Sequence, residues 1–299
     1  MNKMPRKSAA KMPSFTVLAV VLAAVWLGAE MKGDREMSVE VERKICRAAD
    51  GVEIVYSVCG AGEPALVFIH GGLADRGFYD AQLQAFGGRH RTIALDLAGH
   101  GESGGNRVKW GIPEFGADVA AVVDAEGVKR AVLIGNSLGG PAAVEGALRL
   151  GDKAVGVIGI DTFQALGPIT AEEARGRAEA LRTDFRGFLK QMVAALFHAD
   201  ADPKVVAWSE ERMARTRPEP LYAMFLSFAG YDTEAAVRRL KVPLRAVNGD
   251  LYPTDVEGVR KVKADFGAVI MTHMGHYPMI ERPEEFNRLL AEVIAGLGK

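Results

Sequence analysis

The 299-residue sequence predicts an α/β fold, in which helices flank a mostly parallel central sheet. First, short and wholly apolar runs recur along the chain, as is typical of strands covered on both faces. Second, the segments between these runs have the spacing of amphipathic helices. Third, this alternation stops after Asp161 and resumes near Val242, so we expect a helical lid at about residues 165–240, inserted after the sixth strand.

Turn signals and apolar runs define the expected strands. Residues 39–46 and 52–59 are predicted to pair around Asp50-Gly51, a dipeptide that hairpin turns favour. Further strands are predicted at residues 65–69, 92–95, 131–134, 155–160, 242–248 and 268–272. Strands that alternate with helices in this way favour parallel pairing through crossover connections.

Helices are predicted between and after these strands. Residues 115–123 place apolar side chains at helical spacing on one face. The closing helix, at residues 283–294, begins with Pro283 and has Glu284 and Glu285 in its first turn. The helices of the lid are rich in aromatic residues and methionine, and a minority of these facing the active site would form an apolar pocket.

The N-terminal 29 residues are expected to lie outside this fold. Four basic residues precede an uncharged apolar run at residues 15–28, which is shorter than the roughly 20 residues that a membrane-spanning helix needs. A basic flank before a run of this length is typical of a secretory signal. The sequence therefore predicts a signal peptide or N-terminal membrane anchor at 1–29 and a folded domain at 39–299. The protein would then be exported, as a periplasmic, secreted or anchored form, with membrane contact through residues 15–28 only.

Charge and cysteine content exclude several classes of function. The sequence has 37 Lys and Arg residues against 38 Asp and Glu residues, and the basic residues form no stripe, so nucleic-acid binding is not indicated. Cys46 and Cys59 lack the spacing of a metal site. The sequence predicts no metal and no other cofactor.

A candidate nucleophile lies in the segment Gly135-Asn136-Ser137-Leu138-Gly139, between an apolar strand and a helical stretch. In this context a G-x-S-x-G turn holds its serine above the sheet, at a helix N-terminus that favours developing negative charge. An ordinary glycine-rich turn with a serine helix cap could contain the same residues. The hypothesis that Ser137 is a nucleophile therefore depends on further motifs.

The segment His70-Gly71-Gly72-Leu73 follows the third predicted strand directly. A loop at this position can supply one backbone N–H of an oxyanion hole, beside the N–H of the residue after the nucleophile. We assign the two donors to Gly72 and Leu138, with Leu73 as the alternative to Gly72. His70 is predicted to be a buried, hydrogen-bonded residue that shapes the loop.

The candidate base is His276, in the segment MGHYP after the last predicted strand. The order serine, acid, histidine places the base at this point of the chain. His273 is the rival, but it lies at the end of the strand, whereas a catalytic imidazole needs a loop that can reach over the serine.

These motifs together resemble the α/β-hydrolase superfamily. The resemblance is carried by IALDLAGHGESG at 93–104, GNSLGG around Ser137 and GHYPMIERPEEF at 275–286, and it extends from about residue 39 to the C-terminus. It implies the α/β-hydrolase fold and a serine–histidine–acid triad. It also implies that Asp96 and His100 belong to a structural turn after the fourth strand.

The triad acid is the point at which the sequence departs from the superfamily's pattern. The usual aspartate follows the seventh strand, and here both Asp250 and Asp255 do so. We predict Asp250, because it follows the strand at once and its spacing to His276 resembles the usual one. Asp255 could instead cap the helix predicted at 256–262. Asp161, at the end of the sixth strand, is the third candidate, since some relatives place the acid there.

The predicted function is hydrolysis of a small-molecule carboxylic ester through an acyl-enzyme. Thioesterase or lactonase activity would use the same residues. Asn136 and the segment FNRL at 286–289 are similar to carbon–carbon bond hydrolases of the meta-cleavage-product type, although Tyr277 replaces their usual tryptophan. Dehalogenases and epoxide hydrolases of this fold have an aspartate in place of Ser137. Outside enzymes, the alternative is a non-catalytic binding module, which usually lacks the serine or the histidine.

Overall fold

A computed structural model of the protein describes residues 39–167 and 170–298. The signal or anchor segment predicted at residues 1–29, and with it the membrane contact of residues 15–28, lies outside the described residues and stays a prediction. Within the described ranges, no helix combines the length and the apolar character that crossing a membrane requires.

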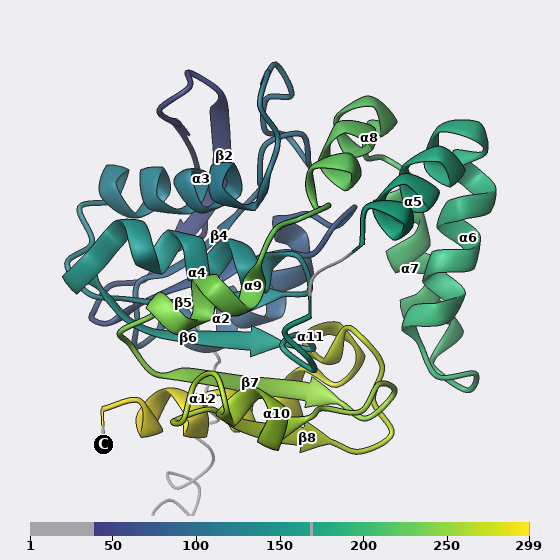
Figure 1. Ribbon diagram of the computed structural model, residues 1–299. Helices are drawn as coiled ribbons and strands as arrows, with labels where there is room; N and C mark the ends of the chain where they lie inside the picture. The colour runs from purple at the N-terminus through teal and green to yellow at the C-terminus, as the bar shows by residue number, and fades with distance from the viewer. Residues whose placement is uncertain (1–38, 168–169, 299) are drawn as a thin grey trace, which may run out of the picture. The chain divides into compact units, whose positions relative to one another are not determined.

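Eight strands form one sheet in the order β1-β2-β4-β3-β5-β6-β7-β8 (Figure 1). Strand β2 pairs antiparallel with both β1 and β4, and the other neighbouring pairs are parallel. The strands are β1 (Glu42–Arg47), β2 (Glu53–Cys59), β3 (Ala65–Ile69), β4 (Thr92–Leu95), β5 (Ala131–Asn136), β6 (Ala154–Ile160), β7 (Leu244–Gly249) and β8 (Gly267–Met271). The predicted mostly parallel sheet is confirmed, and each predicted strand overlaps an observed one.

Helices cover both faces of this sheet. The described helices outside the insertion are α2 (Asp80–Gly87), α3 (Ile112–Ala125), α4 (Gly139–Leu150), α10 (Val256–Arg260), α11 (Pro278–Glu281) and α12 (Pro283–Gly296), with short 3-10 helices at Arg76–Tyr79 and Gly151–Lys153. Helices α3 and α4 pack together on one face, and α2 and α12 pack together on the other (Figure 1). All residues of β3, β4 and β5 are buried between these layers, which explains why their sequences are continuous apolar runs.

The predicted helical insertion lies between β6 and β7. It consists of α5 (Ala171–Thr183), α6 (Phe185–Leu196), α7 (Pro203–Met213), α8 (Pro218–Ser227) and α9 (Thr233–Arg239). Polar caps begin several of these helices: Thr170 and Glu173 form a capping box in α5, and Asp184 caps α6. Figure 1 shows α5–α8 beside the carboxyl ends of β6 and β7, so the insertion covers the edge at which a parallel sheet presents its loops.

Asp255 caps α10, as predicted for this alternative acid. Its Oδ1 accepts a hydrogen bond from the N–H of Gly258 at 2.8 Å. An aspartate at this position satisfies one of the free N–H groups of the first helical turn and complements the helix dipole.

Candidate active site

Ser137 occupies a strained turn between β5 and α4. Its φ of +51° lies in the left-handed region, which costs a non-glycine residue about 1–3 kcal/mol. A Cβ at Gly135 would lie 2.0 Å from the carbonyl oxygen of Gly139, and a Cβ at Gly139 would lie 2.2 Å from that of Ile69. Glycine is therefore required on both sides of Ser137, and the predicted G-x-S-x-G turn is the observed one.

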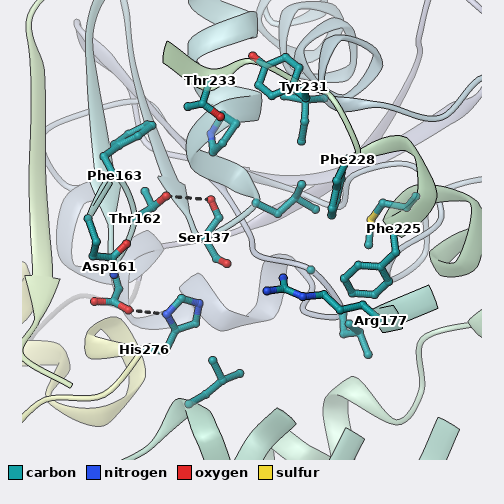
Figure 2. Close-up of a pocket in the computed structure, with 18 of the residues that line it drawn as sticks. Ser137, Asp161, Thr162, Phe163, Arg177, Phe225, Phe228, Tyr231, Thr233 and His276 are labelled. Carbon is teal, nitrogen blue, oxygen red and sulfur yellow. Dashed lines mark hydrogen bonds and ion pairs between the residues drawn. The ribbon is translucent and has the colours of Figure 1, made fainter. Parts of the chain in front are cut away.

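His276 lies between Ser137 and Asp161 (Figure 2). Its Nδ1 is 2.5 Å from Oδ2 of Asp161, whose side chain is 1% exposed. Because an ionised carboxylate only accepts hydrogen bonds, Nδ1 carries the proton, and Nε2 is left as an acceptor on the side of Ser137. Among the described residues no hydrogen bond joins Ser137 to the ring. Catalytic hydrogen bonds are often long before a substrate is bound.

The end of β7 holds Asp161 in place. The N–H of Gly249 donates to Oδ1 of Asp161 at 3.0 Å. The buried side chain of Asn248 forms two hydrogen bonds with the backbone of Thr162, the residue after Asp161. Its Oδ1 accepts the N–H of Thr162, and its Nδ2 donates to the carbonyl oxygen of Thr162. The turn after β6 therefore depends on polar groups supplied by the neighbouring strand.

The structure places Asp161 beside His276, and the contact predicted for Asp250 is not formed. Instead, Asp250 accepts the N–H of His273 at 2.8 Å and the N–H of Met274 at 3.0 Å. These two backbone hydrogen bonds, together with His198, lower the pKa of Asp250 to about 2. The physical reason for the correction is that the turn after β8 offers two free N–H groups within reach of Asp250, and its carboxylate binds them.

Of the two candidate bases, the structure brings His276 to Ser137. His273 points to the loop of the insertion instead, with Nε2 2.9 Å from Asp200 and its side chain 65% exposed. The backbone N–H of His276 donates to the carbonyl oxygen of Leu196 at 2.8 Å, which ties the histidine loop to the end of α6.

Gly72 and Leu138 both line the cavity that contains Ser137. In the described part of the chain, neither backbone N–H donates a hydrogen bond, so both are available to a ligand oxygen. Leu73, the alternative donor, lines the same cavity, and its carbonyl oxygen accepts a hydrogen bond from Thr216 at 2.9 Å. The candidate oxyanion donors therefore lie in the wall of the cavity that contains Ser137.

His70 is buried and hydrogen-bonded, as predicted. Its Nε2 accepts the N–H of Leu97 at 3.0 Å, so Nδ1 carries the proton and donates to the carbonyl oxygen of Gly71 at 2.7 Å. Burial lowers the pKa of His70 to about 4, and burial also lowers the pKa of the neighbouring His100 to about 3. Both rings are therefore neutral parts of the scaffold at neutral pH.

Asp96 has the structural role that the family resemblance implied. It lies in the turn after β4 and accepts the backbone N–H groups of Arg76 at 2.7 Å and Glu102 at 2.9 Å. Its carboxylate also forms an ion pair with the Arg76 guanidinium. These contacts fix the turn on which His100 is buried.

The two buried histidines predict a loss of stability in acid. In the unfolded chain His70 and His100 take up protons below a pKa of 6.5, whereas in the folded protein they stay neutral down to a pKa of about 4 and about 3. At these two groups the unfolded state binds more protons, so their contribution to the free energy of unfolding decreases as the pH falls from about 6.5 to about 4. Burial raises the pKa of Asp118 to about 6, which acts in the opposite direction, so the comparison with a histidine variant is needed to isolate this contribution. Urea unfolding at pH 7 and pH 5 measures this loss. The loss should be smaller in His100→Gln, and an equal loss in both proteins would contradict the assignment.

Ser137 and His276 open into a cavity of about 370 Å³ (Figure 2). Its walls are mostly apolar and come from the sheet domain and the insertion: Leu73, Ile112, Leu138, Pro141, Phe163, Met192, Leu196, Met224, Phe225 and Phe228. Sequence reasoning missed four of its polar residues, Gln164, Arg177, Tyr231 and Thr233, because none belongs to a motif. Within the described ranges, no three His, Cys, Asp or Glu side chains are arranged to hold a metal ion.

Comparison with known proteins agrees with this architecture. The chain matches the model of the alpha/beta hydrolase family over residues 66–289. It is 22% identical over 254 residues to 3-oxoadipate enol-lactonase 2 of Acinetobacter baylyi, a match that covers 82% of this chain and 94% of that protein. The match to RutD of Azorhizobium caulinodans, which is assigned as a carbamate hydrolase, is 38% identical over 96 residues; it covers 32% of this chain and only 36% of that protein.

Among solved structures, the chain is similar to a thermophilic esterase from Thermogutta terrifontis. The TM-score is 0.76 and the sequence identity 24%, and the match covers 86% of this chain and all of the other. An enol-lactonase from Burkholderia xenovorans matches with a TM-score of 0.73 and 23% identity, over 84% of this chain and 100% of that one. At these identities the similarity establishes the fold.

Proposed function

This chain belongs to the alpha/beta hydrolase family, and we propose that it hydrolyses small-molecule carboxylic esters with Ser137 as the nucleophile and His276 as the base. Asp161 is the acid that holds the base in this proposal. The observation that carries it is the pairing of His276 with the buried carboxylate of Asp161 through Nδ1, the ring nitrogen on the side away from Ser137. A buried Asp–His pair beside a strained serine is the arrangement that activates a hydroxyl nucleophile.

The reaction follows from the positions of these groups. The Oγ of Ser137 attacks the ester carbonyl carbon while Nε2 of His276 takes its proton, and Asp161 stabilises the imidazolium that forms. The alcohol leaves with that proton, and water then releases the acid from the acyl-enzyme by the same route. The N–H groups of Gly72 and Leu138 stabilise the oxyanion, and one such donor typically contributes about 10²- to 10³-fold in kcat.

Cyclic esters belong to the same proposal. Ring-opening of a lactone uses the same attack and the same proton transfers, and the leaving alcohol stays attached to the acyl group. The similarity to 3-oxoadipate enol-lactonase 2, which covers most of both chains, supports including lactones among the substrates. The apolar walls of the cavity support an acyl group of modest size, since its volume of about 370 Å³ is near the lower end of small-molecule sites.

A fluorophosphonate probe and a panel of p-nitrophenyl esters of increasing chain length test this proposal. We expect the probe to label Ser137 and the protein to turn over the shorter esters, because an activated serine reacts with both. A thioester and a vinylogous 1,5-diketone acid in the same panel test the thioesterase and carbon–carbon alternatives. A protein that neither reacts with the probe nor hydrolyses any ester would instead be a non-catalytic module.

A further inference from the structure

We propose that Arg177 binds a carboxylate on the acyl part of the substrate, so that the preferred ester is a half-ester or lactone of a dicarboxylic acid. This inference rests on the function proposed above and adds the chemical class of the substrate.

Arg177 is the cationic residue of the candidate active site. It lies on α5, and Figure 2 shows its side chain extending into the cavity. Among the described residues that line the cavity, it is the single Arg or Lys, and the single carboxylate is Asp161, which is paired with His276. The cavity therefore presents one positive charge that no acidic residue of its walls neutralises.

The guanidinium of Arg177 forms no ion pair within the described residues. The same is true of Arg175 on the same helix, whereas some other arginines of the insertion are paired. Arg182 pairs with Glu179 at 2.9 Å, and Arg215 pairs with Glu211 at 2.7 Å. The acid one turn before Arg177 is Glu173, whose Oε2 accepts the N–H and the hydroxyl of Thr170 at 2.9 Å each. These hydrogen bonds lower the pKa of Glu173, with a smaller contribution from the charge of Arg177, but no hydrogen bond joins Glu173 to Arg177 in the described part of the chain. The donors of Arg177 are thus left to water or to a ligand.

The chemistry of the cavity favours a carboxylate as that ligand. The planar fork of a guanidinium matches the two oxygens of a carboxylate and can donate two parallel hydrogen bonds to it, although the exposed position of Arg177 leaves the pair partly open to water. The described lining offers no second cation, which a phosphate dianion would require for charge balance. The helix N-terminus in the cavity, that of α4, is already directed at the reaction centre beside Ser137.

The arrangement in Figure 2 indicates which part of the ester carries the carboxylate. Asp161 and His276 lie on one side of Ser137, and Arg177 lies on the other. His276 must reach the leaving alcohol in order to protonate it, so the alcohol occupies the histidine side. The acyl chain then extends toward Arg177, and its far end meets the guanidinium.

Two esters of equal acyl length test this proposal: mono-4-nitrophenyl adipate, which is anionic, and its neutral methyl ester. We expect kcat/KM to favour the anionic ester by about tenfold, the lower range for a charge-assisted hydrogen bond that is partly open to water. The ratio should fall to about one in Arg177→Met and recover in part in Arg177→Lys. Arg175→Met is the matched control, because Arg175 lies on the same helix, is exposed and does not line the cavity. It should keep the wild-type ratio.

Titration calorimetry with adipate gives a readout that does not depend on turnover. We expect adipate to bind about tenfold more weakly to Arg177→Met than to the wild type or to Arg175→Met. If esters are hydrolysed but neither the ratio nor adipate binding changes in Arg177→Met, the carboxylate site is refuted and the proposed esterase function stands. If no ester is hydrolysed but adipate binding requires Arg177, the site stands and the esterase function is refuted. Inorganic phosphate binding as tightly as adipate through Arg177 would overturn the choice of carboxylate.

Discussion

Replacing Ser137 with alanine is expected to reduce kcat for ester hydrolysis by on the order of 10⁴-fold or more. Without Oγ no acyl-enzyme can form, and only substrate binding and the oxyanion donors remain to accelerate attack by water. The thermal midpoint should change little, because alanine fits the same turn and, within the described residues, the hydroxyl of Ser137 forms no hydrogen bond that would be lost.

Steady-state kinetics and thermal unfolding of Ser137→Ala measure the two effects together. Ser227→Ala is a suitable control, since Ser227 lies in α8 and its hydroxyl donates to the carbonyl oxygen of Met224 outside the catalytic residues. A Ser137→Ala protein with a tenth of wild-type turnover would rule out Ser137 as the nucleophile.

Replacing Asp161 with asparagine is expected to reduce kcat by on the order of 10³- to 10⁴-fold. The asparagine oxygen can still accept the N–H of Gly249, so the turn after β6 should persist. Its amide then presents N–H groups to Nδ1 of His276, which favours the tautomer that has its proton on Nε2. That nitrogen can no longer accept the proton of Ser137, and the positive charge that forms on the ring loses its counter-ion.

Asparagine substitutions of the two other candidate acids are the matched controls. Asp255→Asn should keep both activity and stability, because asparagine caps helices as well as aspartate does, whereas Asp255→Ala should cost about 1 kcal/mol of stability. Asp250→Asn should weaken the turn that His273 and Met274 form and lower the thermal midpoint, with a smaller loss of kcat than Asp161→Asn. A collapse of kcat in Asp250→Asn beside near-normal activity in Asp161→Asn would reverse the assignment.

The parts of the molecule that could be predicted from the sequence depend on burial alone or on contacts between residues close together in the chain. Strands β3 to β6 could be read from apolar runs, because residues buried on both faces must be apolar regardless of which strands lie beside them. The turn around Ser137 and the cap at Asp255 could be predicted for a similar reason. The contact between Gly135 and Gly139 and the hydrogen bond between Asp255 and Gly258 each join residues close together in the chain, although Gly139 is also required by the distant carbonyl oxygen of Ile69.

The partner of His276 was decided by tertiary structure. Asp161 is 115 residues away in the sequence and Asp250 only 26, yet the carboxylate that reaches Nδ1 is the distant one. Parallel pairing of β6 with β7 and of β7 with β8 places the carboxyl end of β6 at the same edge of the sheet as the histidine loop that follows β8. Asp250, although nearer in sequence, is held by the two backbone N–H groups of the turn after β8. The sequence does not show which of the two carboxylates accepts the free backbone N–H groups and which one pairs with the imidazole of His276.

The same limit applies to Arg177. Nothing in the sequence distinguishes Arg175 from Arg177, because both lie in the same polar helical stretch and neither belongs to a motif. Both are also exposed in the structure. Helix α5 packs against α8 and buries Ala174, Ala178 and Leu181, which fixes the rotation of the helix about its axis. That rotation directs Arg177 into the cavity and leaves Arg175 outside it. The sequence determined the elements and the serine turn, while the contacts between elements selected the charged groups that surround Ser137.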